Sequence, residues 1–324
     1  MKTFVKFCKD LGKKNVWRFI FIKGDRLYAN DLEFIWTIKL NFDITNEHSD
    51  WLYGLDYDRF LLLNPESKED IEYKDWGVYI KGNFMENKDA QQVREYENQG
   101  VVLKIKDWER LDFISKAVSV KNFSPILTYV CLRNGTAYGT DGYEIREASD
   151  VYEGWEWQDY LIDIRAFKYW EIEAIRYWKF GTVKYKDTDF MLRFVLCNWR
   201  YPEVDYDKIV GTETKKHITR GNELPEYKGK FDRLALKFDS TEKRLKVYWM
   251  KDKDKIQLWE TAMFWEELEN DIAYEINYKY WNEKKMKGDF TYEIIETEHW
   301  VFMWKRQLWV KTLIRLIKDY KFSI

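Results

Sequence analysis

Proline, cysteine and histidine are scarce in this sequence, and the shortage excludes several classes of protein. The 324 residues include only 4 prolines and 3 cysteines. The cysteines, Cys8, Cys131 and Cys197, are far apart and form no CxxC pair, so the pattern indicates neither a disulfide framework nor a zinc site. Unpaired cysteines are typical of a reducing compartment, and we expect a cytoplasmic protein.

The motifs of common enzymes and cofactor sites are also missing. The 3 histidines, His48, His217 and His299, form no metal-binding motif such as HExxH. The sequence contains no GxSxG, no P-loop and no GxGxxG. Acidic pairs such as Glu266-Glu267 are expected on solvated faces of a chain in which 34% of residues are charged. We therefore expect no catalytic residue, no metal and no cofactor.

Long apolar runs and an excess of one charge are absent as well. No run approaches the roughly 20 apolar residues that a membrane-spanning helix needs. The first residues, MKTFVKFCK, are interrupted by charges, so we expect no signal peptide. Lys and Arg number 54 and Asp and Glu 56, so net charge alone does not predict nucleic-acid binding. Whether the chain binds nucleic acid depends instead on where the basic residues lie.

Aromatic residues, in contrast, are abundant. They make up 19% of the chain, and hydrophobic residues make up 45%. Aromatic enrichment favours strands over helices. The length predicts two or three domains, each large enough to bury its own core.

A short motif recurs along the chain. In residues 132–145, Asn134-Gly135 predicts a tight hairpin turn, because both residues tolerate positive φ. Residues 138–141 (YGTD) match residues 28–31 (YAND), about 110 positions earlier. A weaker third copy lies at residues 240–249. Repeats at fixed spacing predict repeated domains.

A second marker recurs in phase with the first. Residues 55–60, 162–167 and 276–281 each read as an extended segment, a capping Asp or Asn, and a short helix. Two independent markers in register predict three divergent copies of one α+β domain. We place these domains at residues 1–103, 104–211 and 212–324.

Helical spacing of apolar residues predicts several longer helices. Residues 2–11 and 106–118 each show one apolar face, and residues 165–178 form a third candidate. Residues 305–324 alternate apolar and basic side chains and predict a basic amphipathic helix at the end of the chain. The start of the third copy, residues 211–230, shows no clear first helix.

The middle copy resembles the second domain of the bacterial DNA polymerase III beta subunit, the sliding clamp family. The matching segments, in order, are residues 114–119, 123–128, 138–145, 164–167 and 200–206. The run Thr140-Asp141-Gly142-Tyr143 and the exit RYPEVDY are the most specific of these. The first copy matches through residues 27–33, and the third through residues 275–281 and 300–303.

The resemblance implies a DNA-clamp fold and a non-enzymatic function. Two chains would form a head-to-tail ring, with sheets outside and helices lining a channel for double-stranded DNA. The ring would tether a replicative polymerase and would be opened by a clamp loader. Such a channel needs cations that neutralise phosphates without reading bases. The candidates on the predicted helices are Lys6, Lys9, Lys13, Arg110, Lys116, Arg165, Lys168 and Arg176.

The resemblance also implies a hydrophobic pocket that binds a short peptide from partner proteins. Carried over by position, this pocket would include Thr140, Gly142, Tyr143, Ile145, Pro202, Ile209, Val301 and Met303. The alternative is that these residues belong to the loops and core of a clamp-like fold and bind no partner.

The sequence departs from the family pattern in three places. Glu144 stands where the family usually has a basic residue, and Trp304-Lys305 replaces the family's Pro-Met. Residues 305–324 run past the family's usual end and would lie next to the pocket. These departures indicate a divergent clamp, for which a phage or mobile element is a natural source.

Two other functions fit the composition. A β-rich carbohydrate-binding module or glycosidase would use exposed aromatics as sugar platforms, with Trp155, Trp157, Trp170, Trp178 and Trp199 as candidates. A clamp fold could also serve as a scaffold that does not close into a ring.

Overall fold

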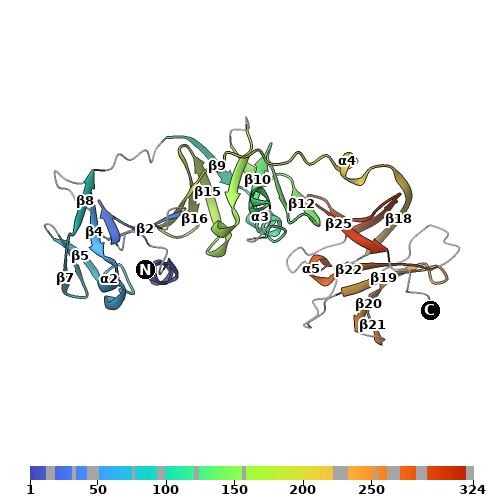
Figure 1. The fold of residues 1–324 in the computed structure, drawn as a ribbon, viewed down its shortest axis with the longest axis horizontal. Coiled ribbons are helices and arrows are strands. Elements are labelled where there is room, and N and C mark those ends of the chain that lie inside the picture. Colours follow the sequence, from blue (N-terminus) through green and yellow to red (C-terminus); the bar gives the residue numbers. More distant parts are fainter. Residues whose placement is uncertain are drawn as a thin grey trace. The chain divides into compact units, whose positions relative to one another are not determined.

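Figure 1 shows the fold as a computed structural model. The structure describes residues 1–11, 19–30, 34–41, 51–74, 77–92, 99–119, 124–154, 158–221, 233–251, 254–260, 271–281 and 290–318. Within these residues, no helix combines the length and the apolar content that crossing a membrane requires.

One four-stranded arrangement occurs three times. In each case a hairpin is extended on one side by the next strand and on the other by a later strand, with antiparallel pairing throughout. The first copy has the order β4 (Trp51–Asp56), β1 (Phe19–Lys23), β2 (Arg26–Asn30), β3 (Phe34–Lys39). The second has β14 (Tyr160–Asp163), β10 (Tyr129–Arg133), β11 (Thr136–Thr140), β12 (Glu144–Ala148). The third has β22 (Ile272–Asn277), β19 (Arg233–Asp239), β20 (Arg244–Lys251), β21 (Asp254–Glu260). The shared order confirms the predicted repeat.

A short helix follows the outer strand in every copy, as the second sequence marker predicts. These helices are α2 (Tyr57–Leu63), the 3-10 helix η3 (Ile164–Lys168) and α5 (Tyr278–Trp281). Each begins with a side-chain oxygen that accepts a backbone N–H. Asp56 accepts from Arg59 at 2.8 Å, Asp163 from Arg165 at 2.9 Å, and Asn277 from Lys279 at 2.9 Å. The caps explain why Asp or Asn recurs at this position.

The predicted hairpin turn has the expected geometry. Asn134 and Gly135 have φ of 49° and 73°, and Arg133 pairs with Thr136 across the two-residue loop. Gly139, two positions before Asp141, is required for close packing and not for a turn. A Cβ there would lie 2.6 Å from the carbonyl oxygen of Ile114, so only glycine lets this part of β11 approach the helix α3 (Trp108–Ser115).

A second group of strands closes on the copy before it. In the second copy this group is β15 (Ile172–Tyr177), β16 (Phe180–Tyr185) and β17 (Phe190–Val195), and β17 pairs with β3 of the first copy. In the third copy it is β23 (Phe290–Thr297), β24 (Val301–Gln307) and β25 (Val310–Lys318), and β25 pairs with β12 of the second copy. The corresponding strands of the first copy, β5 (Ile71–Lys74), β6 (Gly77–Ile80) and β7 (Asn83–Glu86), form a separate sheet.

The chain divides by contacts into two compact units. Unit 1 comprises residues 1–105 and 166–198, and unit 2 comprises residues 106–165 and 199–324. Each unit therefore contains one pairing between successive copies. The boundary between the units cuts the middle copy, so the domain limits 1–103, 104–211 and 212–324 remain a prediction. The remaining elements are α1 (Lys2–Leu11), β8 (Asp89–Gln92), β9 (Val101–Ile105), η2 (Pro125–Thr128), β13 (Tyr152–Glu153), α4 (Tyr206–Val210) and β18 (Glu213–Gly221).

The predicted helix at residues 305–324 is wrong over the described part of that stretch. Residues 301–307 and 310–318 are the strands β24 and β25. Leu313 on one face of β25 and Ile314 and Leu316 on the other are all buried, in different apolar clusters. Leu313 is buried on a face where Lys311 and Arg315 are exposed, so the strand lacks simple alternation and can be mistaken for a helix.

The predicted helix at residues 165–178 is also wrong, apart from the short η3 at its start. Residues 172–177 form β15, which pairs with β16 and β9. A β-bulge between Ile172 and Ala174 shifts the alternation by one residue. The buried Ile172 and Ile175 are consequently three positions apart, which imitates helical spacing. The helices predicted at residues 2–11 and 106–118 are confirmed as α1 and α3. Residues 222–230, in the stretch predicted to lack a first helix, lie outside the described residues.

Candidate peptide-binding face and cationic helices

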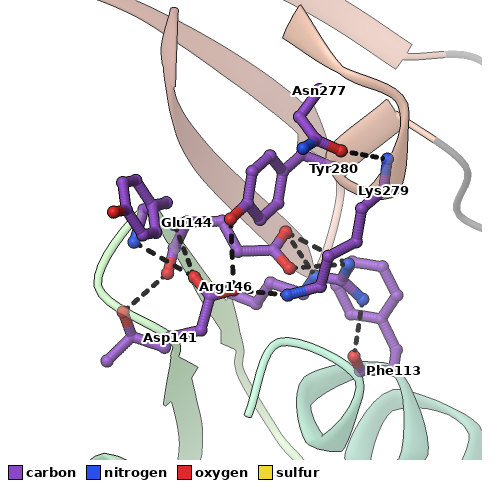
Figure 2. Close-up of polar contacts among 9 residues, drawn as sticks. Phe113, Asp141, Glu144, Arg146, Asn277, Lys279 and Tyr280 are labelled. Atoms are coloured by element: carbon purple, nitrogen blue, oxygen red, sulfur yellow. Dashed lines mark hydrogen bonds and ion pairs between the residues drawn. The ribbon is translucent and has the colours of Figure 1, made fainter. Parts of the chain in front are cut away.

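The turn Thr140–Tyr143 is held by its own side chains (Figure 2). The buried Asp141 carboxylate accepts the backbone N–H groups of Tyr143 at 3.0 Å and Glu144 at 3.2 Å. The Thr140 hydroxyl accepts from Gly142 N–H at 3.0 Å and donates to the Glu144 carbonyl at 2.6 Å. Gly142 has φ of 94°, which side chains rarely adopt. These bonds and the positive φ show what Thr140, Asp141 and Gly142 each contribute to the turn.

The same turn is fixed to the short helix of the third copy. The second oxygen of Asp141 accepts from the Lys279 ammonium at 2.5 Å and from the Tyr280 hydroxyl at 3.3 Å, as Figure 2 shows. Burial, and then the neighbouring Asp141 carboxylate, raises the pKa of Tyr280 above its usual value. The Tyr143 and Tyr280 rings lie 6.3 Å apart. The motif therefore joins successive copies as well as forming a turn.

Glu144 forms a buried ion pair with Arg146. Nε and Nη2 of Arg146 donate to the two carboxylate oxygens at 3.1 and 3.2 Å. Nη1 of Arg146 donates to the carbonyl of Phe113 at 2.9 Å, and the guanidinium lies 4.5 Å from the Phe113 ring centroid. The acidic residue that departs from the family pattern is thus compensated two positions along its own strand (Figure 2).

The opposite face of the same sheet carries an apolar cluster. Thr140 pairs with Ile145, Ile145 with Leu313, and Leu313 with Trp304. Directly paired residues share a face of an antiparallel sheet. Leu313 and Trp304 also belong to one buried cluster with Ile295 and Phe302. We call this surface the Ile145 face; its members are Thr140, Ile145, Ile295, Phe302, Trp304 and Leu313.

Helix α4 packs on the Ile145 face through Tyr206 and Val210. The Tyr206 and Trp304 rings are 4.7 Å apart in an edge contact, and the Tyr206 hydroxyl donates to Glu147 at 2.8 Å. Burial, followed by the Glu147 carboxylate, raises the pKa of Tyr206. Ile209 on the same short helix remains 37% exposed. An exposed apolar residue beside a buried apolar cluster can contact a partner side chain.

Only part of the predicted pocket is assembled at this face. Thr140 and Ile145 belong to it, and Ile209 lies on the helix that packs against it. Tyr143, 61% exposed, is next to β25, because its carbonyl accepts from Arg315 N–H at 3.2 Å. Gly142 and Pro202 are also exposed.

Val301 and Met303 occupy the opposite face of β24, where they pack in the core with Ile314. Met303 is fully buried. Their assignment followed from taking residues 300–303 as the closing strand, whereas the closing strand is β25. Sequence reasoning consequently missed Leu313 and Trp304. The pairing of β17 with β3 indicates that the last strand of a copy pairs with the copy before it. The sequence alone does not reveal this pairing.

The predicted phosphate-binding cations differ in their surroundings. Lys6 and Lys9 are exposed on α1, and Lys9 donates to Asn64 at 2.9 Å. Lys168 is exposed at the end of η3. Lys13 lies outside the described residues.

The other predicted cations are engaged by the protein or lie elsewhere. Arg110 is bound by Asp107 at 2.9 Å and by the Ser149 carbonyl at 3.1 Å, and Arg165 is bound by Asp163 at 2.8 Å. Lys116 pairs with Asp112 at 2.7 Å but keeps 55% of its side chain exposed. Arg176 is on the strand β15 and not on a helix.

The tryptophans proposed as a sugar platform do not act as one set. Trp170 is half-buried and packs 5.0 Å from Phe190 and 5.8 Å from Tyr185. Trp178 is exposed in unit 1 and Trp199 in unit 2. Trp155 and Trp157 lie outside the described residues.

Comparison with known proteins identifies the fold. No protein-family model matches the sequence, and no curated protein is similar to it. The structure is similar to the Helicobacter pylori beta clamp bound to a DNA ligase peptide, with a TM-score of 0.70 and 13% identity over 98% of this chain and 97% of that one. It is similar to the Bacillus subtilis DNA polymerase sliding clamp, with a TM-score of 0.65 and 15% identity over 98% and 97% of the two chains. It is also similar to the Pseudomonas aeruginosa DNA polymerase III subunit beta, with a TM-score of 0.62 and 11% identity over 97% and 98%.

These similarities confirm the α+β DNA-clamp fold predicted from the sequence. Because 98% of this chain is covered, residues 305–318 belong to the shared fold and are not an appendage to it. The expected extra helix is therefore replaced by a regular strand of the clamp architecture.

Proposed function

We propose that this chain, which has the fold of the bacterial sliding clamps, is itself a sliding clamp. Two copies would close head to tail around duplex DNA and tether a replicative polymerase, in the cytoplasm and without catalysing a reaction. The observation that carries the proposal is the way in which successive copies pair. The last strand of a copy, β17 or β25, pairs with the strand that follows the hairpin in the copy before it, β3 or β12. We call this the pairing rule.

This rule leaves one open edge at each end of the series. The strands β3 and β12 are covered by β17 and β25, whereas the equivalent β21 pairs with β20 and with no other strand among the described residues. The first copy's own closing group ends in β7, which pairs with β6 alone in the described part of the chain. Open strand edges pair with other chains. A second molecule that offers β7 to β21 would continue the rule, and a repeated head-to-tail contact closes a ring.

Exposed cations on the helix side of unit 1 support contact with duplex DNA. Lys6 on α1 and Lys168 on η3 are exposed, and neither approaches a carboxylate within 4.0 Å among the ion pairs of the described residues. Long basic side chains that neutralise phosphates bind DNA without reading its sequence. Binding of this kind is weakened by salt, so retention on DNA has to come from enclosure.

The Ile145 face supports attachment of a partner peptide. In the Helicobacter pylori beta clamp a DNA ligase peptide is bound. Here an apolar side chain of a polymerase or clamp-loader peptide would contact Ile209, Ile145 and the exposed Tyr143. Apolar anchors of this kind are a common means of peptide recognition.

Topological retention on DNA tests the proposal. The purified chain, with a bacterial clamp loader and ATP, is incubated with a nicked circular plasmid and washed at high salt by gel filtration. We expect the protein to remain on the circle and to be lost after the plasmid is linearised, because salt removes electrostatic contacts and leaves enclosure. Equal loss from both forms would support an unclosed scaffold instead. The matched variant is Phe84→Asp in β7, whose side chain is 43% exposed, so it should prevent retention without unfolding the chain.

A further inference from the structure

One face of the sheet in unit 1 is separate from the helices and carries an unusual set of side chains. The strands β9, β15, β16 and β17 are neighbours in this sheet (Figure 1). Their alternate residues Leu103, Ile175, Val183 and Leu192 are fully buried on one face. On that same face Leu192 pairs with Trp36, whose ring lies 4.3 Å from Phe7 of α1. The other face is therefore the one turned away from α1.

All the cations of these four strands lie on this second face. Lys104 is paired across from Ala174, and Ala174 from Lys184. Arg176 is paired with Thr182, and Thr182 with Arg193. Because paired residues share a face, four cations, one from each strand, are presented together.

Within the four strands themselves, acidic residues do not balance these cations. Glu173 is the one acid in these four strands, and it pairs with Lys184 at 2.7 Å. The whole chain, in contrast, has 54 basic and 56 acidic residues. The positive potential of this face is thus a local property that net charge conceals.

Exposed apolar side chains gather at one end of the same face. Phe180 is 48% exposed and pairs directly with Val195, which is 54% exposed. Trp178 is 51% exposed in the turn between β15 and β16, two residues beyond Arg176, and Val102, paired with Arg176, is 38% exposed. Two aromatic rings therefore stand beside the cations without being used in the core.

We propose that this surface, the cationic sheet face, binds single-stranded nucleic acid. It is defined by Lys104, Arg176, Trp178, Phe180, Lys184 and Arg193. Cations on adjacent strands are diagonal neighbours, about 7–8 Å apart, and would contact successive phosphates. The Trp178 and Phe180 rings would stack on bases. A strongly acidic peptide would also be attracted by the cations, but it would not use the two planar rings. The aromatic residues therefore favour nucleic acid.

This activity is additional to the enclosure of duplex DNA. The duplex contacts proposed above involve the exposed lysines of α1 and η3, whereas the cationic sheet face is on the side of the sheet turned away from α1. A chain with both surfaces would hold a duplex and a neighbouring unpaired strand, as exists beside a primer end.

Fluorescence anisotropy tests the inference with a labelled 12-nucleotide dT oligomer and, separately, a 12-nucleotide rU oligomer and a 12-base-pair duplex. We expect the single strands to bind, with a slope of about −3 for log affinity against log salt if four phosphates are neutralised. Trp178→Ala/Phe180→Ala should lower the affinity about tenfold or more through lost stacking. Arg176→Gln should flatten the slope by about 0.7. Since these side chains are exposed or half-buried, the variants should fold, as circular dichroism would verify.

Two controls separate this surface from the rest of the molecule. Trp309→Ala removes a tryptophan of unit 2 that is 46% exposed, and Lys6→Gln/Lys168→Gln removes helix-side charges; both should bind dT within about twofold of the parent. Trp178→Ala/Phe180→Ala should retain normal loading on nicked circular plasmid, so failure of this inference and of the clamp proposal are distinguishable. Unchanged dT affinity after removal of both rings would overturn the inference. So would displacement of dT by poly-glutamate as effective as that by unlabelled dT, which would indicate an acidic peptide site.

Discussion

The two pairings between successive copies have the same topology but different chemistry. In unit 1, β17 meets β3 through aromatic side chains: Trp36 lies 4.9 Å from Phe190 and 4.4 Å from Tyr169. In unit 2, β25 meets β12, and the strand β12 contributes the buried Glu144–Arg146 pair. One junction is stabilised by apolar burial, whereas the other also contains charges that have left water.

The difference shows that the repeat specifies a backbone arrangement and not a set of contacts. Burial of large aromatic side chains is favourable wherever the shapes fit. A buried ion pair contributes little net stability, because desolvation opposes the attraction, but losing one partner is costly. The two junctions should consequently respond differently to substitution, and each unit contains a buried thiol, Cys8 or Cys131, that can report its opening.

Trp36→Ala should have the largest effect on stability. Trp36 is 2% exposed, and truncating a buried tryptophan costs about 3–5 kcal/mol. Urea unfolding followed by circular dichroism would measure the loss. Labelling of Cys8, whose pKa is raised by burial, should accelerate more than labelling of Cys131. Trp36→Phe is the matched control, since the indole N–H has no hydrogen-bond partner among the described residues. Equal acceleration at both thiols would mean that the junctions are not independent.

Arg146→Met should destabilise unit 2 by about 3 kcal/mol, because it leaves the Glu144 carboxylate buried without the guanidinium that neutralises it. Here labelling of Cys131, whose pKa burial raises to about 12, should accelerate first. The double variant Glu144→Leu/Arg146→Met should recover to within about 1 kcal/mol of the parent. If the double variant is as unstable as the single one, the pair has a role beyond mutual neutralisation.

Ile209→Asp should have the smallest effect on folding and a specific effect on binding. The side chain is 37% exposed, so the stability should change by less than about 0.5 kcal/mol. Binding of a clamp-binding peptide from a polymerase, measured by calorimetry, should be lost, because a carboxylate would be placed at the apolar contact. Leu62→Asp, at an 83% exposed position of unit 1, is the control and should bind normally. Unchanged binding by Ile209→Asp would exclude α4 from the peptide site.

The repeat could be predicted from the sequence because its signals are local, whereas the clamp fold was implied by the family resemblance. The Asn134-Gly135 turn and the capping residues Asp56, Asp163 and Asn277 act within a few positions, and all adopt the expected conformations. The final strand could not be predicted in the same way. The burial of Leu313 on one face and of Ile314 and Leu316 on the other is created by partners from distant segments, which the periodicity of residues 310–318 alone does not reveal.

The sequence predicts only those residues of the Ile145 face that lie beside a local signal. Thr140 and Ile145 flank a turn with a distinctive sequence, so they were found directly. Leu313 and Trp304 reach the site only through the pairing of β12, β25 and β24, and a shift of one strand replaced them with the core residues Val301 and Met303. Arg176 was misplaced because a β-bulge gave its strand the spacing of a helix.

Cross-linking between two chains tests the central claim, that β21 of one molecule pairs with β7 of another, most directly. In a Cys197→Ser background, one chain carries Gln257→Cys in β21 and the other carries Phe84→Cys in β7; both positions are exposed. A short bis-maleimide should link the mixed chains and neither chain to itself, since the proposed contact is head to tail. Two results would contradict the account. Links only within each single population would indicate a β7–β7 or β21–β21 contact, and no links at all would indicate that these strands do not meet.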